Sequence, residues 1–365
     1  MSLTCGIIGV ANVGKSTLFN CMSNTKVETT SFAFTSNKSN MGSVEVPDPR
    51  LYNLENFQET DKIIPATVEI VDIPGLAKGA NRGEGVGNQF LSDIRNTDAL
   101  IHVLRCFDDE NLPHIDGSVN PVRDIETLNL ELQVKDLESV EKKIDRLSRV
   151  AKSGDKDAKH GIEVLQVYKD HLEGFQNAST APVKEDDKRY VEDLFLLTDK
   201  PVMYVCNVDD ASALTGNAYV EKVKDYLQGE EQNEVLVLAA RLEAEIADLD
   251  PGDRTEFLED AGLTEPGVNK LVRAAYDMLD LMSFFTVGPK EIRAWTIRKG
   301  MTAPQAAGAI HSDLERGFIR AEVMKYDDFV SLGSEQACKE AGKLFVEGKN
   351  YVVGDGDILH IRFNV

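Results

Sequence analysis

The sequence predicts an α/β protein: a doubly wound sheet of parallel strands, interrupted by an inserted helical hairpin and followed by a small module of strands and helices. Three observations support this prediction. Short apolar runs alternate with helical patterns, a gap of about a hundred residues separates two of these runs, and the pattern changes near residue 283. A chain of 365 residues with 42% hydrophobic side chains is long enough for two or three domains.

The apolar runs have the length of strands and lack polar alternation. This is typical of parallel strands that helices cover on both faces. We assign residues 1–124 and 199–282 to this sheet domain. Its expected strands are Leu3–Val10, Ala66–Val71, Ala99–Leu104, Val202–Val205 and Val235–Ala239.

The long gap contains two stretches of coiled-coil-like spacing around an SGDKD turn. They predict an antiparallel helical hairpin whose apolar stripe is its own seam, within an inserted domain of residues 125–198. A third helix is expected near Glu185–Leu197. The seam positions are Leu130, Leu137, Val140, Ile144, Leu147 and Ala151 in the first helix, and Gly161, Leu165, Tyr168, Leu172 and Phe175 in the second.

From Ser283 onward, short strand-like runs surround one helical pattern, which is expected near Ala303–Arg316. A Gly-Asp-Gly-Asp stretch after Val353 supplies a turn. We assign residues 283–365 to a separate α+β module. Its expected strands are Phe284–Val287, Ile292–Ile297, Ile319–Val323, Tyr351–Val353 and Ile358–Phe363.

The net charge of −22 argues against simple electrostatic attraction to bare nucleic acid, and we expect no specific DNA binding. The last 83 residues hold 11 acidic and 11 basic side chains, so the excess negative charge precedes them. The five cysteines are scattered without a CxxC pair, which indicates reduced thiols. We expect no signal peptide, and no apolar run approaches the ~20 residues of a membrane span. A cytoplasmic protein is therefore expected.

The stretch Gly9-Val-Ala-Asn-Val-Gly-Lys-Ser16 matches the phosphate-binding pattern G-x-x-x-x-G-K-[ST] between a strand and a helix. Its glycines allow backbone N–H groups to face phosphate oxygens. Lys15 would meet the β- and γ-phosphates, and Ser16 would offer its hydroxyl to Mg²⁺. The nucleotide-binding set predicted here is Asn12, Val13, Gly14, Lys15, Ser16 and Thr17.

Asp72-Ile-Pro-Gly75 follows the next buried strand and matches D-x-x-G. We expect Asp72 to hold Mg²⁺ and the Gly75 N–H to approach the γ-phosphate. The glycine-rich run from Gly79 to Gly87 is interpreted as a mobile switch segment, because no strand immediately precedes it.

A loop between these two motifs should supply a further hydroxyl to the metal. Phe32-Ala-Phe-Thr-Ser36 is the candidate segment, and Thr35 and Ser36 are alternative ligands. The choice depends on position within the motif set, because Ser and Thr are frequent in any loop.

Asn207-Val-Asp-Asp210 occupies the place of an N-K-x-D base-recognition motif, in which the Asp accepts hydrogen bonds from guanine. Val208 replaces the lysine, and Asp210 is retained. An Asx turn that caps the strand is the alternative interpretation. Ala239 and Ala240, after the last strand, could offer a backbone amide to the base edge.

The group that orients the attacking water is not a glutamine after D-x-x-G, because Leu76 stands there. His114, in the loop of residues 111–124, is the candidate; the alternative is an ordinary exposed loop histidine. Asn12 is a candidate for holding a K⁺ ion that offsets transition-state charge.

The segments GVANVGKST, DIPGLAKGANRGEGVGNQFL, HVLRCF and FFTVGPKEIRAWTI together resemble the YchF/Obg-like ATPase family, and the likeness spans essentially the whole chain. The resemblance implies a P-loop NTPase domain of the OBG type, an inserted helical coiled-coil domain and a C-terminal TGS domain with a ubiquitin-like β-grasp fold. It also implies binding to ribosomes, to the large subunit, and a preference for ATP over GTP.

Individual positions can be compared with the pattern of that family. His114 matches its loop histidine, and F-x-F-x-T puts the switch hydroxyl at Ser36. The base-recognition motif of the family usually ends in Glu, whereas this chain has Asp210. Some members of the family have a redox cysteine at a position that Thr35 occupies in this chain.

Three functions are compatible with these residues. The first is a ribosome-associated, Mg²⁺-dependent ATPase that yields ADP and phosphate. The second is a GTPase of the same fold, since Asp210 suits guanine. The third is a nucleotide-gated scaffold with negligible turnover, which Leu76 favours.

Overall fold

The chain folds into two compact units. The computed structural model describes residues 3–23, 39–74, 86–228 and 235–364. The first unit comprises 3–42 and 70–268, and the second comprises 43–69 and 269–365. Each unit is built around its own six-stranded sheet. Among the described residues, no helix has both the length and the apolar character of a membrane span.

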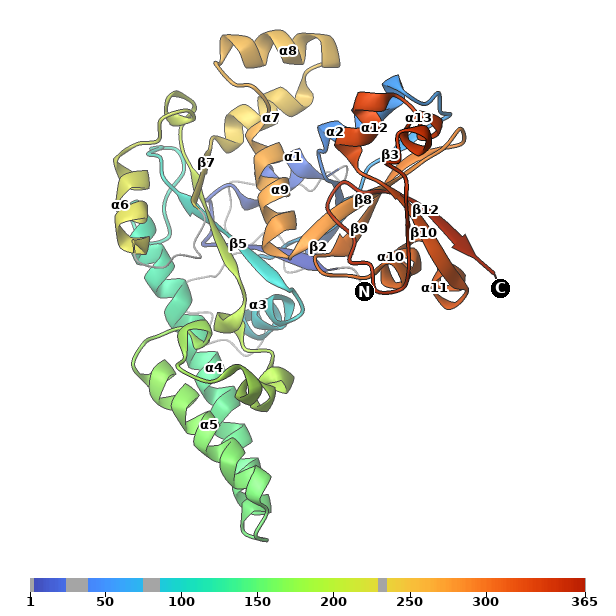
Figure 1. The fold of residues 1–365 in the computed structure, drawn as a ribbon. Coiled ribbons are helices and arrows are strands. Elements are labelled where there is room, and N and C mark those ends of the chain that lie inside the picture. The colour runs from blue at the N-terminus through green and yellow to red at the C-terminus, as the bar shows by residue number, and fades with distance from the viewer. Residues whose placement is uncertain (1–2, 24–38, 75–85, 229–234, 365) are drawn as a thin grey trace. The chain divides into compact units, whose positions relative to one another are not determined.

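The sheet of the first unit has the strand order β2-β4-β1-β5-β6-β7 (Figure 1). The pairs β1/β5, β5/β6 and β6/β7 are parallel, and every residue of β5 is buried. All five predicted strands are confirmed, whereas β2 was not predicted. The strands are β1 (Thr4–Ile8), β2 (Asn40–Glu45), β4 (Thr67–Asp72), β5 (Ala99–Arg105), β6 (Val202–Asn207) and β7 (Val235–Leu238).

Helices pack their apolar faces against this sheet. Two clusters of buried side chains each include a residue of β5, namely Leu100 in one cluster and Leu104 in the other. Phe90 and Ile94 of α3 and Val220, Val223 and Leu227 of α6 lie in these clusters at helical spacing, which fits one-sided burial of the two helices. The helices are α1 (Lys15–Met22), α3 (Val86–Arg95), α6 (Ala218–Leu227), α7 (Ala240–Asp248), α8 (Pro251–Asp260) and α9 (Gly267–Met278), the last of which continues into the second unit.

The predicted helical hairpin consists of α4 (Pro121–Ala151) and α5 (Lys156–Glu173). Asn120 caps α4 by accepting from the Arg123 N–H, and Asp155 caps α5 by accepting from the Ala158 N–H. The first turns of α4 pack on the sheet, and its later turns pack on α5 through a separate buried cluster. The hairpin is the green pair of helices in Figure 1.

The third helix predicted near Glu185–Leu197 is not formed. The chain instead makes 3₁₀ turns at Glu185–Tyr190 and Glu192–Leu194, and Phe195 adopts a left-handed backbone conformation with φ 48°. The buried Asp136 of α4 explains the change of direction. Its carboxylate accepts from the N–H groups of Leu197 and Thr198 at 2.7 and 2.8 Å, which fixes the return to β6.

The sheet of the second unit has the order β11-β10-β12-β8-β9-β3. Four predicted strands correspond to β8, β9, β10 and β12, but the predicted strand Tyr351–Val353 is only an isolated bridge between Thr302 and Val352. The strands are β3 (Ile63–Ile64), β8 (Leu281–Val287), β9 (Ile292–Arg298), β10 (Phe318–Met324), β11 (Phe345–Glu347) and β12 (Ile358–Phe363).

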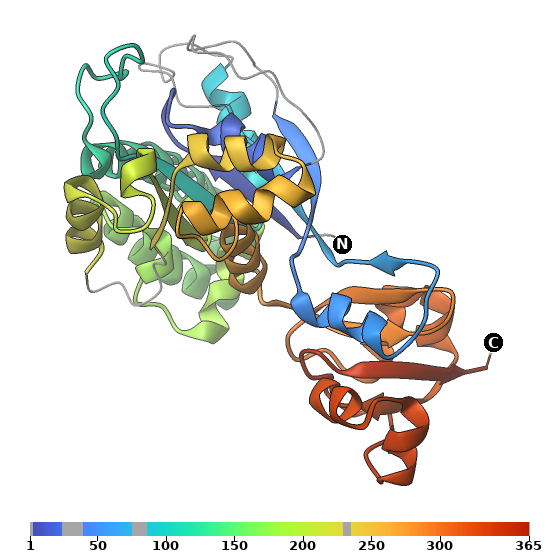
Figure 2. The ribbon, with the colours of Figure 1, turned by 90° about the horizontal axis from the view of Figure 1, so that it is seen from above.

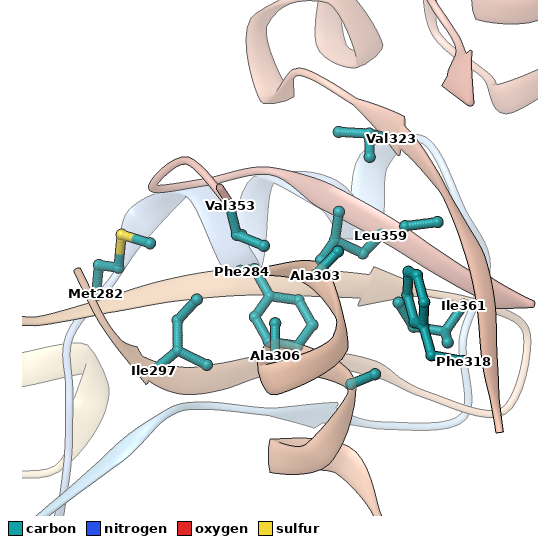
Figure 3. Close-up of a cluster of buried hydrophobic side chains, with 12 residues drawn as sticks. Met282, Phe284, Ile297, Ala303, Ala306, Phe318, Val323, Val353, Leu359 and Ile361 are labelled. Carbon is teal, nitrogen blue, oxygen red and sulfur yellow. The ribbon is translucent and has the colours of Figure 1, made fainter. Parts of the chain in front are cut away.

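The core of the second unit lies between this sheet and α10, in the manner of a β-grasp. Figure 3 shows Phe284 and Ile297 of the sheet close to Ala303 and Ala306 of α10, whose small side chains allow close approach. The predicted helix Ala303–Arg316 is broken at its middle, because His311 is extended, with φ −163°. The helices are α2 (Pro49–Asn53), α10 (Ala303–Ile310), α11 (Ser312–Arg316), α12 (Tyr326–Leu332) and α13 (Glu335–Glu340).

Residues 43–69 belong to the second unit, which the sequence did not predict. The segment contains α2 and β3, and β3 pairs in parallel with β9 (Figure 2). Arg50 makes ion pairs with Asp48 and Asp355, both at 2.8 Å, and lies over the ring of Phe285. The second unit is therefore assembled from two separate stretches of the chain.

Candidate nucleotide-binding site

The phosphate-binding loop, Gly9–Ser16, connects β1 to α1 in a conformation that two glycines make possible. Gly9 has φ 145° and Gly14 has φ 99°. A Cβ atom at Gly9 would lie 2.5 Å from the Val103 carbonyl oxygen, and one at Gly14 would lie 2.5 Å from the Asn207 amide nitrogen. Side chains at either position would therefore open the loop.

Lys15 begins α1 and is buried, as is Val13 before it, whereas Thr17 is half-buried. The Lys15 Nζ donates to the Val10 carbonyl oxygen at 2.8 Å, so the ammonium group lies across the loop. Burial lowers the pKa of Lys15 to about 8, and the charge of Asp72 partly opposes that shift.

The lowered pKa of Lys15 predicts a pH-dependent affinity for nucleotide. Above pH 8 the nucleotide-free protein loses the ammonium proton, and a bound triphosphate must restore it. We expect the affinity for an ATP analogue to be flat below pH 8 and to fall about tenfold per pH unit above it. Isothermal titration calorimetry measures this profile. Lys15→Arg stays charged throughout and serves as the control, and a profile equal to that of the wild type would contradict the assignment to Lys15.

Ser16 and Asp72 form the candidate magnesium site. The Ser16 Oγ donates to the Asp72 Oδ2 at 2.7 Å, which joins the start of α1 to the end of β4. The other carboxylate oxygen, Oδ1, is buried without a hydrogen-bond partner among the described residues. Burial raises the pKa of Asp72, while Ser16 and Lys15 oppose the rise. An orphaned buried oxygen beside a hydroxyl is a donor set that suits Mg²⁺.

Several predicted residues lie outside the described part of the chain. These include both candidate switch hydroxyls and the glycine of D-x-x-G with the leucine that follows it. The glycine-rich run is described only from Val86, in α3. The residues outside the described ranges are Thr35, Ser36, Gly75 and Leu76.

Asn207, at the end of β6, braces the phosphate-binding loop. Its side-chain amide donates to the Val13 carbonyl oxygen and accepts from the Ala240 N–H, both at 2.8 Å. The residue is buried, and both ends of its amide contact protein. Asn207 therefore joins the backbone of the loop to the start of α7.

The other residues of the predicted base-recognition motif differ in exposure. Val208 is buried in a hydrophobic cluster, so its side chain cannot replace the lysine of N-K-x-D. Asp210 is exposed, and its carboxylate lies 3.8 Å from the Nε of Arg241. Ala239 precedes α7 and is buried, and the Ala240 N–H is already donated to Asn207.

His114 is buried, unlike the exposed histidine of the alternative interpretation. Its Nδ1 accepts from the Asp116 N–H at 3.1 Å, so the ring proton is on Nε2, which donates to the Asp124 Oδ2 at 3.0 Å. The two nitrogens are thus engaged by protein. Asn12 has a left-handed backbone conformation, with φ 62°. Its side-chain amide donates to the Pro113 carbonyl oxygen at 3.3 Å and so links the phosphate-binding loop to the His114 loop.

Two residues that support this loop were not predicted. The buried Arg105 guanidinium, at the end of β5, donates to the carbonyl oxygens of Phe107, Asp109 and Leu112. Asp124, in the first turn of α4, holds His114; burial raises its pKa, and His114 and then Arg123 oppose the rise. The sequence signal was an ionisable residue within a buried apolar context, namely the Arg in HVLRCF.

The candidate residues for phosphate and magnesium lie where β1 and β4 end in a doubly wound sheet, a frequent site for ligands in such folds. Fold and site define a P-loop nucleoside-triphosphate-binding protein. Residues 4–148 match the family model described as a 50S ribosome-binding GTPase, and residues 281–364 match the YchF-GTPase_C model, described as a protein of unknown function (DUF933).

The chain is also similar over its full length to curated and solved proteins. It is 47% identical over 367 residues to the ribosome-binding ATPase YchF of Bacillus subtilis and 46% identical over 365 residues to that of Escherichia coli O157:H7, with 100% of each chain covered. The structure of the Schizosaccharomyces pombe YchF GTPase has a TM-score of 0.87 at 32% identity and covers 99% of this chain and 98% of its own. The chain belongs to the YchF family.

Proposed function

We propose that this protein is a cytoplasmic, ribosome-associated ATPase that requires Mg²⁺ and releases ADP and phosphate. The observation that carries the proposal is the arrangement of Lys15, Ser16 and Asp72 around a glycine-dependent loop. The names of the relatives, which are ribosome-binding ATPases, support both the nucleotide and the partner. The large ribosomal subunit is the proposed binding site, in keeping with the description of the model that matches residues 4–148.

In the proposed reaction, water attacks the γ-phosphorus, and the bond to the bridging oxygen breaks to release ADP. Amides of the phosphate-binding loop and Lys15 hold the phosphate oxygens, and Ser16 and Asp72 would hold Mg²⁺, which neutralises charge on those oxygens. Lys15 must exchange the Val10 carbonyl for phosphate. Among the residues outside the described ranges, Gly75 is proposed to contact the γ-phosphate and Ser36 or Thr35 to complete the metal site.

His114 is the proposed water-orienting residue. Because its Nε2 donates to Asp124, this nitrogen can reach a water molecule only after that hydrogen bond breaks. The link between Asn12 and Pro113 provides a route by which a filled phosphate site could shift the loop. The Asn12 Oδ1 remains the candidate ligand for K⁺.

ATP is the proposed substrate, and GTP is the second candidate. The buried Val208 removes the side chain that lies along guanine, and Arg241 partly neutralises Asp210. The GTP alternative is favoured by the exposure of Asp210, whose carboxylate could accept from guanine. Ala239 and Ala240 are proposed to line the base through their backbone.

A competition experiment tests the proposed substrate. A fluorescent ATP analogue bound with Mg²⁺ is displaced by unlabelled ATP or GTP, and we expect ATP to compete at least about tenfold better, a difference of about 1.4 kcal/mol. Turnover of both nucleotides is then measured in K⁺ and in Na⁺ buffers. Preferential displacement by GTP would reverse the assignment. Equal rates in the two cations would remove the role proposed for K⁺.

A further inference from the structure

The far end of the α4–α5 hairpin has a charge opposite to that of the whole protein. Residues 142–160, called the basic tip here, hold seven Lys or Arg and three Asp side chains, whereas the chain has a net charge of −22. Uniform solvation of an acidic protein would not concentrate cations in one short turn and its flanks. The reversal of sign is therefore a local feature that needs an explanation.

Most cations of the basic tip are exposed and lack an acidic partner. Lys143 and Arg146 have a structural role, because both bind Asp193. The remaining cations make no ion pair with any described residue. These cations are Lys142, Arg149, Lys152, Lys156 and Lys159.

The acidic side chains of the basic tip are mostly occupied within the hairpin. Asp155 accepts from the Ala158 N–H as the cap of α5. Asp157 accepts from the Tyr190 hydroxyl at 2.5 Å and from Arg189 at 3.0 Å. Of these acids only Asp157 is in an ion pair, with Arg189 outside the tip. Because seven Lys or Arg face three Asp, the basic tip keeps a positive charge that is available to an outside partner.

The hairpin does not need these cations to fold. Its seam is an apolar cluster that includes Val140, Leu165 and Tyr168, and Gly161 lets the ring of Tyr190 approach. The turn itself is open, since a Cβ at Gly154 would have no heavy atom within 4 Å. In Figure 1 the tip is the end of the green hairpin that points away from the sheet strands of the same unit. A large partner could therefore reach it.

The composition of the basic tip indicates what kind of partner it fits. Residues 142–160 contain no Phe, Trp or Tyr. Helices that lie on membranes use Trp, Phe and Leu as apolar anchors, and protein interfaces centre on aromatic residues and Arg. Cations without such a centre suit the repeated phosphates of a nucleic-acid backbone.

We infer that the basic tip binds the phosphate backbone of ribosomal RNA and is thus one of the contacts between this protein and the ribosome. The inference rests on the proposed ribosome association. Arg149 follows Lys142 by two turns on one side of α4, and Lys159 follows Lys156 by one turn of α5, so successive phosphates can be met from both helices. The contact positions the protein without reading base sequence.

The test compares two variants of the full chain that lose equal charge in different places. Lys152→Gln with Lys156→Gln alters the basic tip, and Lys222→Gln with Lys224→Gln alters α6 of the same unit. Co-sedimentation with purified ribosomes is measured between about 0.05 and 0.2 M KCl. We expect the tip variant to bind about tenfold more weakly, with a salt slope of log K against log [KCl] shallower by about two. The α6 variant should bind like the wild type.

A change of opposite sign adds a second measurement. Asp145 is an exposed acid within the basic tip, and Asp145→Asn should strengthen binding to ribosomes. Phosphatidylserine vesicles and polyglutamate serve as alternative anionic probes. Equal weakening of the tip and α6 variants, unchanged binding of the tip variant, or tip-dependent binding only to vesicles or polyglutamate would overturn the inference.

The proposed function and this inference can fail independently. ATP turnover without ribosomes should be the same for the wild type, the tip variant and the α6 variant, because none of the altered residues belongs to the nucleotide site. A wild-type protein without turnover would refute the proposed ATPase while sedimentation still reports on the tip. Normal turnover with unchanged sedimentation of the tip variant would refute the inference alone. Thermal unfolding checks that all variants are folded.

Discussion

Lys15→Ala is expected to reduce ATP turnover by a factor on the order of 10³ or more and to weaken nucleotide binding severely. Lys15 is the charged side chain at the phosphate-binding loop, and its Nζ is already positioned there by the Val10 carbonyl oxygen. Without it, the developing charge on the γ-phosphate has one fewer fixed cation. Steady-state phosphate release and titration of an ATP analogue measure the two effects.

The nucleotide-free form of Lys15→Ala should nevertheless remain folded, because burial already disfavours the charge of Lys15, as its lowered pKa of about 8 indicates. Thermal unfolding with and without ATP provides the control. At about 100 times its Kd, a ligand adds about 2.7 kcal/mol to the stability of the wild type, and this gain should vanish in the variant. Turnover equal to that of the wild type would rule out the nucleotide site described above.

His114→Ala is expected to lower turnover by about 10²–10⁴-fold, the range typical of a residue that positions or transfers a proton. The affinity for ATP should change little, because the loop and the Ser16–Asp72 pair remain. Single-turnover hydrolysis and analogue titration separate these quantities. The variant should also be less stable, since the buried Asp124 carboxylate loses its hydrogen-bond donor.

A conservative variant distinguishes the proposed role of His114 in hydrolysis from its structural role. His114→Gln keeps an amide N–H that can donate to Asp124 and can also orient water, so it should retain part of the turnover and most of the stability. Lost stability with full turnover in His114→Ala would assign the residue to the fold alone. Loss of nucleotide binding in proportion to turnover would do the same.

Much of the first sheet was predictable because its strands are buried on both faces, and such strands read as apolar runs. The exposed edge strand β2 has alternating burial in a sequence rich in Asn, Gly and Ser, so it gave no comparable signal. The prediction of a third helix in the insert was wrong because a tertiary contact determines the backbone there. Asp136 fixes the backbone at Leu197 and Thr198, and this contact outweighs the local helical pattern.

In the candidate site, too, some residues were predictable from the sequence and others were not. The glycines, Lys15, Ser16 and Asp72 follow spacings that chemistry restricts, so a sequence pattern is sufficient to find them. The role of Asn207 is different, because its partners Val13 and Ala240 are distant in sequence and its motif suggested a base contact. The buried hydrogen bond between His114 and Asp124 likewise depends on how the loop folds around Arg105. No local sequence pattern encodes that fold of the loop.

The interleaving of the two units limits how this protein can be dissected genetically. A stop codon after Val268 would remove Asp355 and β9 but keep Arg50 and β3. Arg50 would then lose its ion pair with Asp355, and β3 would lose the strand with which it pairs. The segment that contains Arg50 and β3 lies in sequence between β2 and β4, and both of these strands belong to the sheet of the first unit. Shortened chains would therefore lose solubility and nucleotide affinity together. Point substitutions, rather than truncations, are therefore suited to assigning functions to each of the two units.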